Sequence, residues 1–206
     1  MRQNISALPG DMQVVSDAPE RQPLPYLYIF FGLSGSGKSY LGRRWAEQVG
    51  AAYYNSDRVR KELAGLAGAS RQRLDFNCGI YSPEFSRKTY DRLIVLAKGE
   101  LAAAKPCVLD ATYTSAYERD LAVKELAELA RIIFIMCKCS DQLAQQRFTL
   151  RASDPKAVSD GRWEIYQEQK RRFTQPDKIK GAKLLVLDTD AEINLLLNKI
   201  ASLIRV

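Results

Sequence analysis

The stretch YLYIFFGLSGSGKS, residues 26–39, determines the fold expected for this chain. It begins with an apolar run of strand length, Tyr26–Phe31, and continues directly into the pattern G-x-x-x-x-G-K-S. A helical pattern begins near Lys38, so the glycines lie between a strand and a helix. Glycines let backbone N–H groups turn inward around a polyphosphate, and the helix N-terminus adds a positive dipole end. The stretch therefore predicts a phosphate-binding loop.

The polar side chains of the loop suit such a site. Lys38 can pair with β- and γ-phosphate oxygens, and the hydroxyl of Ser39 can ligate Mg²⁺. The alternative is a glycine-rich turn that contains Lys-Ser by coincidence, but the four fixed positions would coincide in roughly one per cent of chains this long. The strand before the loop and the helix after it make coincidence rarer still. The residues expected to bind ATP are Gly32, Ser34, Gly35, Ser36, Gly37, Lys38, Ser39 and Tyr40.

Four more apolar runs of strand length come later in the chain, separated by helical patterns. Continuously apolar runs are typical of parallel strands that have helices on both faces. With 206 residues, 46% of them hydrophobic, the chain is expected to form one three-layer α/β domain with a five-stranded parallel sheet over residues 26–206. The first 25 residues contain four prolines and no periodicity, so we expect a flexible arm over residues 1–25. The four later strands are expected at Ala51–Asn55, Pro106–Asp110, Ile132–Cys137 and Leu184–Leu187.

The composition excludes several kinds of chemistry. The chain has no histidine, which excludes Ser-His-Asp and Cys-His nucleophiles and His-ligated zinc. Its net charge of +7 is compatible with an anionic partner but does not identify one. No apolar run approaches the roughly 18 to 20 residues of a membrane span, so we expect a cytoplasmic protein with no membrane contact. The four cysteines lack C-x-x-C spacing, and we interpret them as reduced, buried thiols: Cys78, Cys107, Cys137 and Cys139.

Two aspartates come directly after predicted strands and should lie at the same edge of the sheet as the loop, because ligands of open α/β sheets bind beyond the carboxyl ends of the strands. Asp110 closes the third apolar run and could hold Mg²⁺ directly or through water. The alternative is a helix cap, but the next helix is expected to begin near Ser115, too far downstream. The hypothesis for Asp110 is therefore a metal ligand, alongside Ser39.

Asp57 opens a helix after the second strand, and Arg60 lies three residues further on. We expect both side chains to point toward the cleft, where Asp57 could accept or orient the proton of an acceptor hydroxyl. In the alternative interpretation Asp57 only caps its helix and pairs with Arg60. The buried stripe of this helix is expected to consist of Val59, Leu63 and Leu66.

A helix expected from about Ser140 to Ala152 has Arg147 and Arg151 on one face, because they are four residues apart. These arginines could close over ATP and stabilise charge on the transferring phosphoryl group, which predicts a lid at about residues 140–160. The alternative is a solvated helix face.

The stretch after Gly161 is basic and contains aromatic residues, so it could track a nucleic-acid backbone. A solvated face with a core aromatic stripe is the alternative that we favour.

The combination of these motifs resembles the P-loop kinases of the AAA_33 group, which are related to polynucleotide 5′-hydroxyl kinases and more distantly to zeta toxins. The resemblance spans about residues 26–190. It rests on the loop, on S-D-x-x-R at residues 56–60, Y-S-P-E at 81–84, V-L-D-A-T at 108–112 with Arg119 downstream, and R-x-x-x-R at 147–151. The resemblance implies the strand order 2-3-1-4-5 with a helical lid.

The resemblance also implies roles for individual residues. Asp57 would be the acceptor-side base, and Arg60 would steady the acceptor or its neighbouring phosphate. The residues implied in catalysis are Lys38, Asp57, Arg147 and Arg151. Those implied in binding the acceptor are Asp57, Arg60, Thr112 and Arg119.

The activity that we expect is transfer of the γ-phosphoryl group of ATP, with Mg²⁺, to an acceptor hydroxyl. The acceptor could be a 5′-hydroxyl end of RNA or DNA, or a small molecule such as a sugar, a nucleotide sugar or an antibiotic. A non-catalytic module that binds ATP or nucleic acid is the alternative of another class. A translational-type GTPase is disfavoured, because N-K-I-A at residues 198–201 lacks the aspartate of a guanine-reading N-K-x-D.

Overall fold

The sheet has the predicted strands in the predicted order. The computed structural model describes residues 23–66, 79–152 and 162–204. Its five strands are all parallel, in the order β2-β3-β1-β4-β5. Each expected strand is found within one residue at either end, because each is a continuous apolar run. The strands are β1 Tyr26–Phe31, β2 Ala52–Asn55, β3 Cys107–Asp110, β4 Arg131–Lys138 and β5 Lys183–Asp188.

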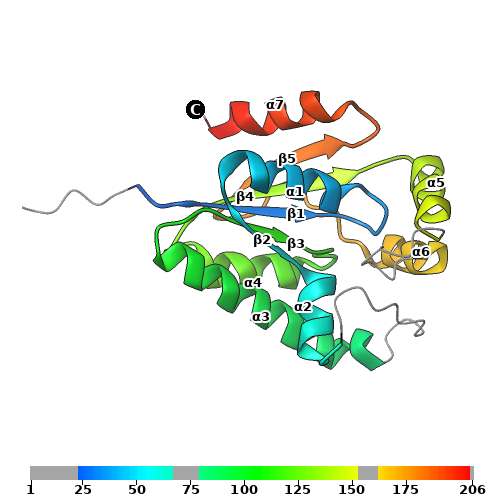
Figure 1. Cartoon of the computed structure of the whole chain (residues 1–206), viewed down its shortest axis with the longest axis horizontal. Coiled ribbons are helices and arrows are strands. Elements are labelled where there is room, and N and C mark those ends of the chain that lie inside the picture. The colour runs from blue at the N-terminus through cyan, green and yellow to red at the C-terminus, as the bar shows by residue number, and fades with distance from the viewer. Residues whose placement is uncertain (1–22, 67–78, 153–161, 205–206) are drawn as a thin grey trace, which may run out of the picture.

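Helices cover both faces of the sheet and one of its ends. Helices α1 and α7 lie on one face, α3 and α4 on the other, and α5 and α6 lie beyond the carboxyl ends of the strands (Figure 1). A short 3-10 turn, η1, precedes α3. The bounds are α1 Lys38–Val49, α2 Ser56–Leu63, η1 Gly79–Tyr81, α3 Pro83–Ala102, α4 Ala116–Leu126, α5 Asp141–Ala152, α6 Trp163–Arg172 and α7 Ile193–Ile204.

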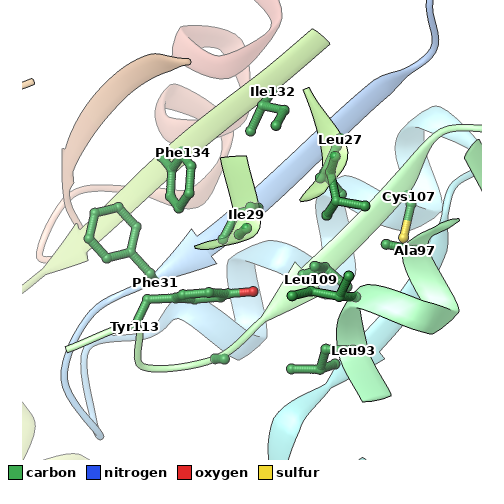
Figure 2. Close-up of a cluster of buried hydrophobic side chains, with 14 of the residues drawn as sticks. Leu27, Ile29, Phe31, Leu93, Ala97, Cys107, Leu109, Tyr113, Ile132 and Phe134 are labelled. Atoms are coloured by element: carbon green, nitrogen blue, oxygen red, sulfur yellow. The ribbon is translucent and has the colours of Figure 1, made fainter. Parts of the chain in front are cut away.

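Alternate residues of β1 face two separate cores, which explains why the whole strand is apolar. Tyr28 and Phe30 pack toward α1, where the ring of Trp45 meets Tyr28 edge-on at 5.4 Å between centroids. The alternate residues Ile29 and Phe31 pack toward α3 and α4, together with Tyr113 (Figure 2). Both cores bury their members almost completely, so the sheet is a rigid support for the loops at its carboxyl edge.

Local capping fixes where the helices near this edge begin. Ser115 and Glu118 form a reciprocal capping box at α4, and Ser82 caps α3 ahead of Pro83. The start expected near Ser115 is therefore confirmed. In α2 the expected buried stripe is wrong at Leu63, which is 44% exposed, whereas Val59 is buried as expected.

Some expectations fall outside the described residues. The proposed arm lies mostly within residues 1–22, and Cys78 and the second half of the expected lid lie in the two internal gaps. Cys107 and Cys137 are buried free thiols, and Cys139 is half-buried. Among the helices of the described ranges, none is both long and apolar enough to cross a bilayer.

Candidate active site

The loop after β1 is tied closely to both neighbouring strands. The amide of Gly32 donates to the carbonyl of Thr112 beyond β3 at 3.3 Å. A Cβ at Gly32 would come 2.2 Å from the carbonyl oxygen of Cys137 in β4, so only glycine fits there. Gly37 has a φ of 83° and precedes α1, which no side chain in the described part of the chain caps. The loop therefore presents an uncapped helix N-terminus at the carboxyl edge of the sheet.

The predicted side chains at the end of the loop lie in different surroundings. The Nζ atom of Lys38 donates to the carbonyl of Leu33 in its own loop at 3.3 Å. Ser39 is in the first turn of α1. Tyr40 is 59% exposed, and the guanidinium of Arg44 lies 5.8 Å from the centre of its ring.

Asp110 is the most enclosed polar group of this edge. It is fully buried, and its Oδ2 accepts from the Tyr53 hydroxyl and from Asn55 Nδ2, the latter at 2.7 Å. Its Oδ1 is buried and has no hydrogen-bond partner among the described residues. The register explains the arrangement, since Asn55 of β2 pairs directly with Asp110 of β3 and Tyr53 lies two residues earlier on the same face. The sequence predictions did not include Tyr53 or Asn55. Asn55 could have been found, because it is a polar residue at the end of an otherwise apolar strand.

The oxygen donors at this edge suit Mg²⁺. An unpartnered buried carboxylate oxygen is costly unless a cation or donor completes it. Oδ1 of Asp110 and the hydroxyl of Ser39 are hard oxygen ligands, and the Tyr53 hydroxyl lies 3.4 Å from the Ser39 carbonyl oxygen. The described residues include no cluster of three or more acidic, cysteine or histidine ligands. A Mg²⁺ ion held here would thus depend on phosphate oxygens for much of its coordination.

Asp57 lies at the N-terminus of α2, half-buried, with the helix capped by another residue. The side chain of Asn55 accepts from the amides of Asp57 and Arg58, both at 3.1 Å. The capping role that the alternative interpretation gave to Asp57 is therefore taken by Asn55.

The guanidinium of Arg60 is held by η1 and the first turn of α3. It donates to the carbonyl of Ile80 at 2.7 Å and to Ser86 Oγ at 3.2 Å, and it lies 5.0 Å from the ring centre of Tyr81. Arg60 is only 7% exposed. Arg60 joins α2 to η1 and α3. Its carbonyl, hydroxyl and aromatic partners lie 20 or more residues further along the chain, so helical spacing cannot reveal them.

Arg119 is likewise a structural joint. It is 2% exposed and donates to the carbonyls of Tyr113 at 2.7 Å and Thr174 at 2.8 Å. This arrangement does not support the acceptor-binding role that the family resemblance implied. Thr112 stays half-buried at the end of β3, and its hydroxyl lies 3.2 Å from the Tyr90 hydroxyl. Of these two residues, only Thr112 keeps the position of a candidate cleft residue.

Helix α5 packs directly on the phosphate-binding loop. A Cβ at Gly35 would meet the Phe148 ring at 3.0 Å. Arg147 donates to the Gly35 carbonyl at 3.0 Å, and to the hydroxyl and carbonyl of Thr189 at 3.1 and 3.0 Å. The Thr189 hydroxyl in turn donates to the Ser36 carbonyl at 2.7 Å. In this structure Arg147 holds the backbone of the loop against the segment after β5.

Arg151 lies within electrostatic reach of both candidate carboxylates. Burial lowers the pKa of its guanidinium, and the positive charge of Arg147 lowers it further. The charges of Asp57 and Asp110 act in the opposite direction. The charges of one residue from α2 and one from β3 thus act on a guanidinium group of α5.

Helix α6 completes the far side of the loop. Tyr166 stacks on Trp163 at 5.0 Å and packs edge-on against Phe148 at 6.1 Å, forming a small core with α5. The amide of Ser34 donates to Gln169 Oε1 at 2.9 Å. A cavity of about 290 Å³ lies between α6, the loop and the end of β4. The aromatic residues of α6 are thus core residues, as the favoured alternative held.

The basic side chains of α6 are paired with acidic neighbours. Lys170 contacts both carboxylate oxygens of Asp141 at 2.7 Å. Arg171 and Arg172 both pair with Glu168. This pairing reduces the positive potential that a nucleic-acid backbone would need from α6.

Comparison with known proteins gives consistent matches. The family model AAA_33, described as an AAA domain, matches residues 27–176. Shikimate kinase of Chromobacterium violaceum is 25% identical over an alignment of 187 residues, which covers 88% of this chain and 91% of that protein. APS kinase CysC of Mycobacterium tuberculosis, in complex with AMPPNP and APS, has a TM-score of 0.63 at 22% identity, over 90% of this chain and 100% of that one. A gluconokinase from Sinorhizobium meliloti 1021 has a TM-score of 0.58 at 17% identity, over 86% and 90%. These two structures share the fold.

Proposed function

The chain belongs to the AAA_33 family, and from that premise we propose that it is an ATP- and Mg²⁺-dependent kinase of a small hydroxyl compound. The proposal depends chiefly on the loop that contains Lys38 and on Asp110 at the end of the neighbouring strand, whose buried Oδ1 has no hydrogen-bond partner among the described residues. The charges of Asp57 and Asp110 also act on the guanidinium of Arg151. Phosphoryl transfer requires mainly positioning and electrostatic stabilisation, and these groups are the types that supply both.

Each group has a distinct role in this proposal. The loop amides and Lys38 bind the β- and γ-phosphates, while Ser39 and Asp110 hold Mg²⁺, which neutralises charge on the phosphate oxygens. Asp57 orients the acceptor hydroxyl and receives its proton. Arg151 stabilises charge on the transferring group, and α5 is the first part of a lid that we assign to about residues 140–160. A module that only binds ATP would have no need of Asp57 at this position.

The acceptor that the contacts favour is a small molecule rather than a nucleic-acid 5′ end. Arg60 and Arg119, the two arginines that could have held a neighbouring phosphate, are buried and donate to carbonyl groups. A nucleic acid would be positioned mainly through contacts to its phosphates. The similar shikimate kinase and gluconokinase are, by their names, kinases of small hydroxyl compounds, which supports the same choice.

The test is a labelling experiment with γ-labelled ATP and Mg²⁺. The protein is incubated with a panel of sugars, other hydroxyl metabolites, antibiotics and 5′-hydroxyl oligonucleotides, with Lys38→Ala as the control. We expect label in a small-molecule acceptor and loss of most turnover in the control. Label in the oligonucleotides, together with an oligonucleotide affinity that falls steeply with salt concentration, would identify a nucleic-acid 5′-hydroxyl end as the acceptor instead. No labelled acceptor and no nucleotide binding would refute the kinase assignment.

A further inference from the structure

Two residues of β2 bracket the carboxylate of Asp110 from one side. The Tyr53 hydroxyl and Asn55 Nδ2 both donate to the same oxygen, Oδ2. The other oxygen, Oδ1, is buried and has no hydrogen-bond partner among the described residues. One oxygen of this carboxylate accepts two hydrogen bonds and the other accepts none from the described part of the chain. The two donors belong to β2 and lie outside the G-x-x-x-x-G-K-S loop.

The orientation of Asn55 is determined by its second contact. Its Oδ1 accepts from the amides of Asp57 and Arg58 at the start of α2. Since an amide side chain has only one oxygen, its NH₂ group must face Asp110. Asn55 therefore connects the candidate metal ligand with the first turn of the helix that carries Asp57.

Tyr53 is an equally constrained donor. Its hydroxyl donates to Oδ2 of Asp110, because a carboxylate oxygen can only accept. The hydroxyl also lies 3.4 Å from the carbonyl oxygen of Ser39, and the Arg43 guanidinium lies 5.6 Å from the ring centre. Tyr53 thereby contacts both residues that are expected to hold Mg²⁺.

We propose that Tyr53 and Asn55 are positioning residues that hold Asp110 with Oδ1 alone available to a divalent cation. They do so by occupying Oδ2, and Asn55 at the same time sets the position of Asp57 relative to that cation. This inference rests on the proposed function, because it concerns the cation that accompanies the nucleotide. Groups that orient a metal ligand typically change metal affinity about 10- to 100-fold when removed.

The experiment compares two neighbouring tyrosines of β2. Tyr53→Phe removes the donor to Asp110, whereas Tyr54→Phe removes a hydroxyl that donates to Glu100 at 2.7 Å. Binding of ADP is measured by calorimetry in EDTA and over a series of Mg²⁺ concentrations. For Tyr53→Phe we expect unchanged binding in EDTA and about a tenfold higher Mg²⁺ requirement. Tyr54→Phe should match the wild type in both.

Two further measurements separate positioning from a loss of folding. The thermal midpoint of each variant is recorded without ligand, and Asn55→Ser keeps a helix-capping side chain but is too short to reach Asp110. We expect Asn55→Ser to raise the Mg²⁺ requirement as well. A Tyr53→Phe protein that folds and has the wild-type Mg²⁺ requirement would overturn the inference but leave the kinase proposal intact. A wild-type protein whose ADP binding ignores Mg²⁺ would also overturn the inference, whereas the kinase proposal is tested separately by the labelling experiment.

Discussion

The two sides of the phosphate-binding loop are built differently. On the β2–β3 side, Asp110 is held by groups whose positions result from the register of adjacent strands. On the α5–α6 side, Arg147 and Gln169 hold the loop through bonds to its backbone carbonyl and amide groups. Strand register cannot change without disrupting the sheet, whereas a side-chain donor can exchange partners. The first side is therefore suited to fixing a reactive geometry, and the second to responding when a nucleotide binds.

The largest expected effect lies on the strand side. Asp57→Ala should lower phosphoryl transfer by about 10²- to 10⁴-fold, because the acceptor proton loses its base, while binding of ATP-Mg²⁺ stays unchanged. Labelled product and calorimetric ATP affinity are measured in parallel. Glu62→Ala, an exposed acidic residue of the same helix, is the matched control and should retain transfer. Normal transfer by the Asp57 variant would remove the acceptor-side assignment.

A smaller effect is expected on the α5–α6 side, when the hydrogen bonds that Arg147 donates are removed. Arg147→Ala should weaken nucleotide binding about tenfold, because the charge-assisted bonds to Gly35 and Thr189 are lost. Arg147→Lys should recover only part of the affinity, since an ammonium group cannot reproduce the guanidinium fork. The measurement is nucleotide affinity by calorimetry, with Arg44→Ala on the exposed face of α1 as control. Equal nucleotide affinity in all three variants would mean that the hydrogen bonds of Arg147 to Gly35 and Thr189 do not contribute to nucleotide binding.

The smallest effect concerns the ion pair that joins α5 and α6. Hydrogen bonds from Lys170 and Tyr166 hold the pKa of Asp141 below its ordinary value of about 3.9. A lowered pKa means that this stabilisation is present above about pH 4 and is lost as the pH falls through the folded-state pKa. Because the pair is half-exposed, Asp141→Asn should lower the free energy of unfolding at pH 7 by only about 0.2–1 kcal/mol. Denaturant titrations at pH 7 and pH 3 measure the free energy of unfolding of both proteins. A difference between wild type and variant that is larger at pH 3 than at pH 7 would contradict the prediction.

The fold could be predicted from the sequence because its determinants are local. An apolar run such as Tyr26–Phe31 indicates a strand with both faces buried, and the glycines together with Lys38 indicate a phosphate-binding loop directly after it. The resemblance to P-loop kinases added the strand order. The rule that strand ends share one edge predicted Asp57 and Asp110 beside the loop. Arg151 was predicted instead from its helical spacing to Arg147 and from the family resemblance.

The remaining site features depend on partners that are distant in sequence. Ile80 and Ser86 accept the hydrogen bonds of Arg60, and no spacing within α2 encodes those partners. Tyr53 gains its role only when β2 pairs with β3, since its partner Asp110 is 57 positions away. The prediction that Leu63 is buried failed for a related reason. The periodicity of α2 shows which residues share a face, but not which segment of the chain covers that face.

The aromatic core between α5 and α6 also gives the molecule a built-in optical reporter. The chain has two tryptophans, and they lie in different parts of the molecule: Trp45 in the core beneath α1, and Trp163 against Phe148 and Tyr166. Indole emission depends on the surroundings of the ring, so quenching by a soluble agent will separate the enclosed fluorophore from the one near the loop. Motion of α5 and α6 can thus be followed in the unlabelled protein, from the emission of Trp163 alone, by using Trp45→Phe.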